Sequence, residues 1–167
     1  MCKAYYPLKT PHYCGAFLKI SYAEVVKKRT YGELTMTDKE AVEAIVREIA
    51  ASFSGAESTK DWTDETLWFD AAPFASVGVA NAKKVFDEAF GNLQSCEVEI
   101  LDMRTRILGD AALVCSVQKW DTMNKDGSAN PPFMMRQTDY LEKQGDVWKV
   151  LHEHTSMAQG WDGKIVE

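Results

Sequence analysis

The sequence predicts a single α+β domain in which N-terminal helices pack against a C-terminal antiparallel sheet. Two observations support this fold class. In the first half of the chain, apolar residues recur with the period of an amphipathic helix, and from residue 96 onward they alternate as they do in strands. Helices that come before the strands, instead of alternating with them, are typical of α+β domains. The 167 residues, 46% of them hydrophobic, suffice for one domain with a substantial core.

The first helix is expected to begin at the segment Thr37-Asp38-Lys39-Glu40, which is a capping box. The Thr37 hydroxyl can accept a hydrogen bond from the Glu40 amide, and the Glu40 carboxylate can accept one from the Thr37 amide. The residues that follow form an apolar stripe with a 3.6-residue period: Ala41, Val42, Ile45, Val46, Ile49, Ala50 and Phe53. Gly55 is expected to end the helix.

Between this helix and the sheet, the sequence predicts shorter elements. Residues 58–66 are polar and predict a short helix or a turn. Residues 66–69 are apolar and predict a short strand. A second helix is expected from about Asn81 to Phe90, because Gly78 precedes it, an apolar stripe runs through it and a Gly-Asn pair at 91–92 ends it.

The second half of the chain predicts a four-stranded antiparallel meander. The expected strands cover residues 96–107, 111–122, 133–143 and 147–156. Gly109-Asp110 and the Gly145 region supply tight turns, and a polar loop joins the second strand to the third. Each strand therefore pairs with the next one in the chain.

Residues 1–35 are expected to form an irregular basic N-terminal extension, separate from a domain over residues 36–158 and a tail over residues 159–167. The extension contains six basic and two acidic residues, whereas the whole chain has a net charge of −6. Two hypotheses account for it: a weak organelle-targeting segment, or translation that begins at Met36. Mass spectrometry that finds residue 1 intact in the mature protein would contradict both.

Charge and cysteine content exclude some classes of partner. The net charge of −6 argues against nucleic acid or a membrane as the main partner, because those surfaces favour clustered lysine and arginine. No apolar run approaches the length of a transmembrane helix. The four cysteines show no metal-binding spacing, and a reducing, cytoplasmic location is the simpler interpretation. No cofactor and no metal are expected.

A run near the C-terminus reads Trp148-Lys149-Val150-Leu151-His152-Glu153-His154-Thr155-Ser156. It resembles the closing strand of SnoaL-like and ketosteroid isomerase-like proteins of the nuclear transport factor 2-like superfamily, and that of the calcium/calmodulin-dependent protein kinase II association domain. The spacings of Gly109-Asp110, Gln137-Thr138 and Gly145 agree with this resemblance, which covers roughly residues 37–158. It implies a cone-shaped, cystatin-like fold with a cavity for a small molecule. The superfamily includes enzymes and non-catalytic domains, so fold does not fix function.

Strict alternation would divide the closing strand into two faces. One would carry Trp148, Val150, His152, His154 and Ser156, and the other Leu151, Glu153 and Thr155. The resemblance to the kinase association domain implies a cavity face made of Lys119, Gln137, Asp139, Glu153 and Thr155, with Phe90 in the wall. Two of that domain's three basic pocket positions are Asp139 and Thr155 here, so a neutral or cationic ligand is expected.

Asp139 and Glu153 are the main candidates for catalysis. A carboxyl group in an apolar cavity has a raised pKa, because burial disfavours its charged form, and it can then exchange protons near neutral pH. His154 is a third candidate, since histidine titrates in that range. The alternative is that both carboxylates pair with Lys119 or Arg136, or lie at a solvated rim.

Other residues are candidates for ligand binding. Trp62 and Phe90 are expected in the pocket wall, although most aromatic residues of this chain are expected to fill the core. Asp70 is either a pocket acid or a cap. His152 and His154 could hold a metal only with further ligands, so hydrogen-bonded histidines at the sheet edge or at a dimer contact are the preferred interpretation.

Two functions remain open at this stage. The first is a cofactor-free acid–base enzyme, such as an isomerase, dehydratase or cyclase, that acts on a small apolar molecule. The alternative is a non-catalytic domain that binds a small ligand or mediates oligomerisation. A homodimer through the outer sheet face is also expected, as relatives commonly form one, and a monomer in light scattering would contradict it.

Overall fold

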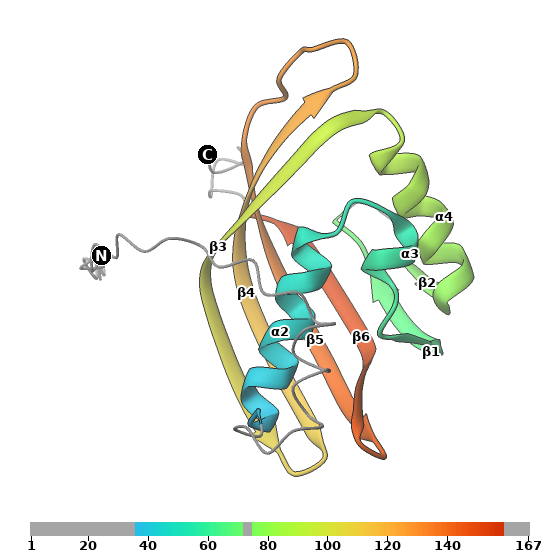
Figure 1. The fold of residues 1–167 in the computed structure, drawn as a ribbon, viewed down its shortest axis with the longest axis vertical. Helices are drawn as coiled ribbons and strands as arrows, with labels where there is room; N and C mark the ends of the chain where they lie inside the picture. The colour runs from blue at the N-terminus through green and yellow to red at the C-terminus, as the bar shows by residue number, and fades with distance from the viewer. Residues whose placement is uncertain (1–35, 72–74, 159–167) are drawn as a thin grey trace, which may run out of the picture. The chain divides into compact units, whose positions relative to one another are not determined.

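The structure is a computed structural model that describes residues 36–71 and 75–158. Within these ranges, helices pack on one face of a curved six-stranded sheet (Figure 1). The expected extension over residues 1–35 and the expected tail over residues 159–167 lie outside the described residues. None of the helices in the described ranges has the length and apolar composition needed to cross a membrane.

The sheet has the strand order β2-β1-β6-β5-β4-β3. Its strands are β1 (Trp62–Phe69), β2 (Ala75–Val77), β3 (Leu93–Leu108), β4 (Ala111–Asn124), β5 (Phe133–Gln144) and β6 (Val147–Met157). The predicted meander of the last four strands is confirmed. Two further strands extend this antiparallel sheet at its β6 edge: β1 pairs with β6 in parallel and carries β2, which is antiparallel, on its other side. Local sequence patterns do not encode such a pairing between distant segments.

The first helix, α2 (Asp38–Ala51), begins at the predicted capping box. The Thr37 hydroxyl accepts from the Glu40 amide at 3.3 Å, and the Glu40 carboxylate accepts from the Thr37 amide at 2.8 Å. Every predicted apolar position inside the helix is buried, from Ala41 to Ala50. The helix ends at Ala51, before Gly55, because the Ser52 hydroxyl donates to the Glu48 carbonyl and its backbone turns extended.

The connection from α2 to β1 contains a single helical turn, α3 (Gly55–Ser58). The expected helix or turn over residues 58–66 is therefore displaced, and β1 begins at Trp62. The second predicted helix is α4 (Val79–Phe90), which follows Gly78 as expected. Gly55 packs so closely on α4 that an added Cβ would overlap the Lys83 carbonyl oxygen, which explains the glycine at this position.

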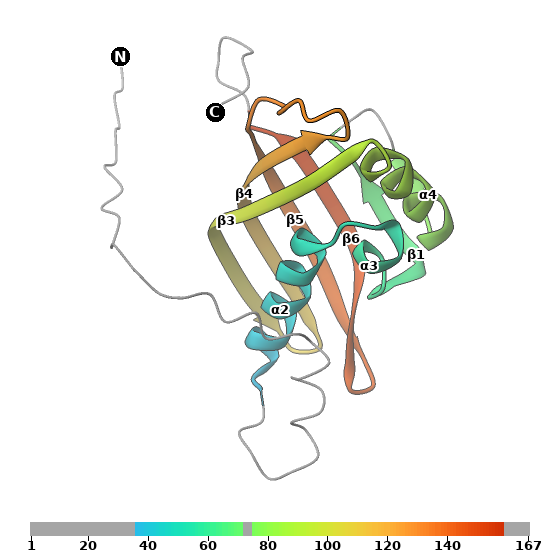
Figure 2. The same cartoon turned by 45° about the horizontal axis from the view of Figure 1, so that its top comes forward.

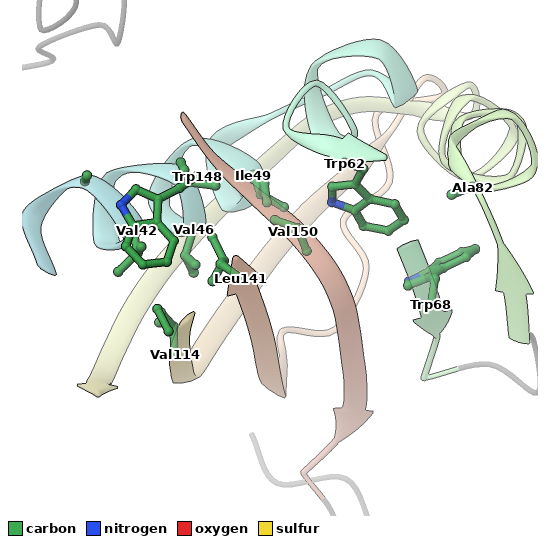
Figure 3. Close-up of a cluster of buried hydrophobic side chains, with 13 residues drawn as sticks. Val42, Val46, Ile49, Trp62, Trp68, Ala82, Val114, Leu141, Trp148 and Val150 are labelled. Carbon is green, nitrogen blue, oxygen red and sulfur yellow. The ribbon is translucent and has the colours of Figure 1, made fainter. Parts of the chain in front are cut away.

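One hydrophobic cluster joins the helices to the sheet (Figure 3). Trp148 lies at its α2 end, whereas Trp62 and Trp68 lie on the α4 side, next to Ala82. Leu141, Val114 and Val150 are fully buried between them on the inner face of the sheet. Each such side chain contributes about 1.5–3 kcal/mol by its removal from water, so this cluster holds α2 on the sheet.

A β-bulge at Leu151 changes which side chains of β6 face inward. Tyr140 pairs with His152, but Leu141 pairs with Val150, so Leu151 is an extra residue on β6. Strict alternation, as predicted, is therefore wrong for this strand. Val150 and Glu153 are three positions apart, so strict alternation would put them on opposite faces, yet both are buried.

Candidate functional site

A cavity of about 40 Å³ lies between the inner face of the sheet, the end of α2 and the inner side of α4. Its walls are Ile49, Ala50, Ser58, Trp68, Asp70, Phe86, Phe90, Trp120, Met135, Gln137, Glu153 and Thr155. This space holds a few water molecules and is well below the roughly 150 Å³ that an enclosed site needs for benzene. The cavity is smaller than the resemblance implied, because aromatic side chains of β1 and α4 fill much of the interior. The rings of Trp68 and Phe86 are only 4.9 Å apart.

The chemical centre is a pair of buried carboxyl groups, Asp139 on β5 and Glu153 on β6. The two residues are direct cross-strand partners, and their exposed fractions are 0% and 2%. Only Glu153 of the pair lines the cavity, so Asp139 lies behind it. Within the described part of the chain, no lysine or arginine forms an ion pair with either one. The alternative prediction, of pairing with Lys119 or Arg136 or a place at a solvated rim, is therefore wrong.

Burial makes this pair hold a proton near neutral pH. Burial raises the pKa of Asp139 to about 7, although hydrogen bonds from Gln137 and Glu153 act in the opposite direction. The pKa of Glu153 lies well above its usual range, first because of burial and then because of the negative charges of Asp139 and Asp70. The indole of Trp68 opposes this effect and favours the charged form of Glu153. Two carboxyl groups this close share a proton, and their titration belongs to the pair.

A chain of side-chain hydrogen bonds orients the groups around the pair. The Trp120 indole donates to Gln118 Oε1 at 3.0 Å, and Gln118 Nε2 donates to Gln137 Oε1 at 3.0 Å. Gln137 Nε2 then donates to Asp139 at 3.0 and 3.1 Å and to Glu153 Oε2 at 3.3 Å. An indole can only donate, so Trp120 fixes the direction of both amides. The amide hydrogens of Gln137 therefore face the carboxyl pair.

The sequence did not single out Gln118 or Ser116, which accepts from Gln118 Nε2 at 3.0 Å. Both are buried, on the same face as Val114. A signal did exist: Val114, Ser116 and Gln118 occupy every second position of a strand, so two polar residues continue a buried apolar row.

Asp70 and Thr155 form a second polar group at the cavity wall. The Thr155 hydroxyl donates to Asp70 Oδ1 at 3.2 Å, and the Ala71 amide donates to Asp70 at 2.6 Å and to Thr155 at 3.0 Å. Asp70 is half-buried, and its carboxylate is thus tied to the end of β1. It combines the two predicted roles, because it lines the cavity and caps the chain at Ala71.

The structure brings most of the predicted site residues to this cavity. Asp139, Glu153, Gln137, Thr155, Asp70 and Phe90 lie in it or directly behind it. Trp62 lies deeper, in the hydrophobic core, with its ring centre 6.2 Å from that of Trp68.

Lys119 does not reach the cavity. Its neighbour Gln118 is fully buried, so alternation turns Lys119 to the outer face, where its ammonium lies 3.2 Å from the Asp121 carboxylate. The prediction that Lys119 lies on the cavity face, which came from the resemblance to the kinase association domain, is therefore wrong. The residue of β4 that faces inward here is Gln118.

His152 and His154 lie on the outer face, where the bulge at Leu151 directs them. The Phe69 ring packs edge-on against both, with ring centres 5.6 and 6.1 Å away. His152 Nδ1 lies 3.1 Å from the Leu67 carbonyl oxygen. His154 is thus separated from the cavity by the sheet, which removes it as a catalytic candidate. Within residues 36–71 and 75–158, no three histidine, cysteine, aspartate or glutamate side chains gather as a metal site.

Residues 34–160 match the family described as SnoaL-like domain. No curated protein matches the sequence.

Solved structures resemble this one in fold. A ketosteroid isomerase-like protein from Erwinia carotovora atroseptica has a TM-score of 0.62 and 19% identity, covering 74% of this chain and 98% of that chain. A protein with a cystatin-like fold from Caulobacter vibrioides has a TM-score of 0.62 and 15% identity, covering 74% and 90%. A nuclear transport factor 2-like superfamily protein from Salmonella enterica has a TM-score of 0.60 and 14% identity, covering 81% and 92%. At these identities the likeness shows the fold alone, and it confirms the predicted one.

Proposed function

We propose that this chain, which belongs to the family of SnoaL-like domains, is a cofactor-free acid–base enzyme that acts on a small, largely apolar molecule. One observation carries the proposal: a buried carboxyl pair with raised pKa values presents one member, Glu153, to a cavity with apolar walls. Perturbed carboxyl groups in such a place are a physical mark of proton-transfer sites.

The pair supplies both an acid and a base. Glu153 in its charged form can remove a proton from carbon, and Asp139 behind it can then donate or accept the hydrogen bond that the changed charge requires. Return of the proton to a different carbon gives an isomerisation. Loss of a hydroxyl group from the neighbouring carbon, with a proton supplied by the pair, gives a dehydration.

Binding of such a molecule requires the cavity to expand, and α4 is the wall that can move. Ala82 is its only fully buried residue in the described structure, and Phe86 and Phe90 are half-buried. A helix with few buried contacts opens at a low free-energy cost. We therefore expect a ligand to displace Phe86 and Phe90 from the cavity wall.

Exchange of carbon-bound protons tests the proposal without knowledge of the substrate. The full chain is incubated in D2O with small cyclic ketones, and loss of the α-proton signals is followed by NMR. The rate with wild type should rise with pH above the range in which carboxyl groups usually titrate, because the reaction needs charged Glu153 and burial raises the pKa of that group well above its usual value. Glu153→Gln should lower it at least about 100-fold.

Asp121→Asn is the matched control, since it also turns a carboxyl group into an amide, but at a partly exposed position on β4. It should leave the rate unchanged. Equal exchange by wild type and Glu153→Gln, with both variants folded by circular dichroism, would rule the proposed acid–base role out.

A non-catalytic ligand-binding domain is the second candidate, and the hydrogen-bond chain from Trp120 to Asp139 favours it. Every amide in that chain has partners, as in a network that only stabilises the fold. In that case ligands would raise the melting temperature of wild type and of Glu153→Gln equally, because the variant would bind them as well as wild type does. It would catalyse no proton exchange.

A further inference from the structure

A chain of hydrogen bonds runs from Trp120 to the carboxyl pair, and only its first member has a fixed role. The Trp120 indole N–H donates to Gln118 and can never accept. The amides of Gln118 and Gln137 can each turn over, which exchanges their donor and acceptor ends, and the Ser116 hydroxyl can donate or accept. The indole therefore decides which end of each amide faces which neighbour.

The reversed direction is unfavourable in this part of the sheet. If Gln118 turned over, its NH2 group would meet the indole N–H, and two donors would face each other without an acceptor. Bulk water cannot satisfy them, because Gln118 is 0% exposed and Gln137 only 3%. Gln118 Nε2 thus stays on Gln137 Oε1 at 3.0 Å, which leaves Gln137 only hydrogens to offer to the pair.

Gln137 is the donor that contacts both carboxyl groups of the pair. Its Nε2 lies 3.0 and 3.1 Å from the two Asp139 oxygens and 3.3 Å from Glu153 Oε2. The Trp68 indole acts in the same direction on Glu153 alone, whereas Asp70 of β1 adds an opposing negative charge. The walls contributed by α2 and α4 are apolar at the cavity: Ile49, Ala50, Phe86 and Phe90. The charge of the pair therefore depends on these donors.

We propose that Trp120 is a positioning residue for the carboxyl pair. Through Gln118 it holds the amide hydrogens of Gln137 against the pair, and it thereby stabilises the negative charge that one carboxyl group must carry to act as a base. The inference rests on the proposed function for its effect on the reaction rate, but its effect on the proton of the pair can be measured without a substrate.

Loss of the indole N–H would free both amides to turn over. The Gln137 carbonyl oxygen would then face the pair and accept the O–H of a protonated carboxyl group. A hydrogen bond to the neutral form disfavours ionisation, so the pair would keep its proton to a higher pH. Trp120 thus acts on the base through the intervening amides, without touching it.

Trp120→Phe removes the N–H and keeps an aromatic ring beside Phe133, whose ring centre lies 5.9 Å from that of Trp120. The titration of the pair is followed by NMR in the full chain labelled with ¹³C at the side-chain carboxyl carbons of aspartate and glutamate. We expect it to move to higher pH by about one unit, a tenfold change in the ratio of charged to protonated pair, because a hydrogen bond to a charged group is lost.

The pH profile of α-proton exchange separates positioning from a loss of structure. In Trp120→Phe the rate should rise over a pH range that lies about one unit higher, and it should reach the wild-type rate at high pH, because Glu153 itself is intact. A merely structural defect would lower the rate at every pH.

Trp148→Phe is the matched control. It makes the same substitution at another buried indole that donates to a carboxylate, Asp38, at 3.2 Å, but this contact lies at the start of α2. The titration of the pair should stay where it is in wild type. Gln118→Met should reproduce the effect of Trp120→Phe, and the double variant should move the titration no further than Gln118→Met alone, because Trp120 acts through Gln118.

An unmoved titration in Trp120→Phe would overturn the inference, and so would a double variant whose effect is the sum of the two single ones. If Trp120→Phe fails to fold, Gln118→Met decides in the same way. Failure of the proposed function looks different: Glu153→Gln would then keep the proton exchange of wild type, whatever Trp120→Phe does to the titration.

Discussion

Asp139 and Asp121 lie on neighbouring strands of one sheet but meet opposite surroundings. Asp121 is partly exposed and has the Lys119 ammonium 3.2 Å away. Asp139 has no contact with water, and its neighbours are an amide and a second carboxyl group. The charged form of a carboxyl group loses its hydration in such a place, so Asp139 and Glu153 keep a proton that a surface aspartate would release.

This shared proton makes stability depend on pH. Both carboxyl groups have folded pKa values above their unfolded ones, so between about pH 4 and 7 the folded state binds more protons. The free energy of unfolding should therefore fall as pH rises through this range, by roughly 4 kcal/mol, since the pKa of Asp139 is raised from 3.8 to about 7 and one pKa unit corresponds to about 1.4 kcal/mol. Urea unfolding of wild type and of the double variant Asp139→Asn, Glu153→Gln measures the difference, and parallel pH curves would contradict the expectation.

At the scale of single residues, the sequence predicted the burial of Asp139 and Glu153 correctly, but it predicted the residues around them only in part. The resemblance placed Asp139, Glu153, Gln137 and Thr155 on the inner face, and all four are buried there. It placed Lys119 on the inner face, whereas Lys119 lies on the outer face and its neighbour Gln118 faces inward. The place of Trp68 in the cavity wall could not be predicted, because it depends on which groups tertiary packing brings together.

At the scale of elements, the β-bulge at Leu151 decides how β6 contributes to the site. Without it, one strand could not turn both Trp148 and Val150 toward α2 and also turn Glu153 and Thr155 toward the cavity. The helices α2 and α4 were predictable, since capping residues and apolar stripes are local signals. The parallel pairing of β1 with β6 was not, because these strands are far apart in the sequence and come together only in the folded chain (Figure 2). The bulge was not predictable either, because no glycine or other local signal marks Leu151.

The contact between α3 and α4 gives a prediction for the cavity wall. The Gly55 amide donates to Asp87 Oδ1 at 2.7 Å, and a methyl group at Gly55 would overlap the Lys83 carbonyl. Gly55→Ala should lower the free energy of unfolding by about 1–3 kcal/mol, because the helices must separate. Ala56→Ser, at an exposed position of the same turn, should change it by less than about 0.5 kcal/mol. Urea unfolding at equilibrium compares the two, and equal effects would show that close packing here is unimportant.

At the scale of the whole domain, helices before strands predicted the architecture, and the residues of the closing strand predicted the family. The size of the cavity was beyond such patterns. It depends on how far the rings of Trp68, Phe86 and Phe90 fill the space between α4 and the sheet, and the same aromatic residues would suit a packed core or a pocket wall. The domain thus contains a small cavity next to a carboxyl pair.

The titration of the two buried carboxyl groups tests this account most directly. In the full chain labelled with ¹³C at the side-chain carboxyl carbons of aspartate and glutamate, two signals should vanish in the double variant Asp139→Asn, Glu153→Gln. We expect these signals to be those of protonated carboxyl groups at about pH 5 and to change only near pH 7 or above. If both instead titrate near pH 4, as exposed carboxyl groups do, the pair holds no proton at neutral pH and the proposed chemistry is wrong.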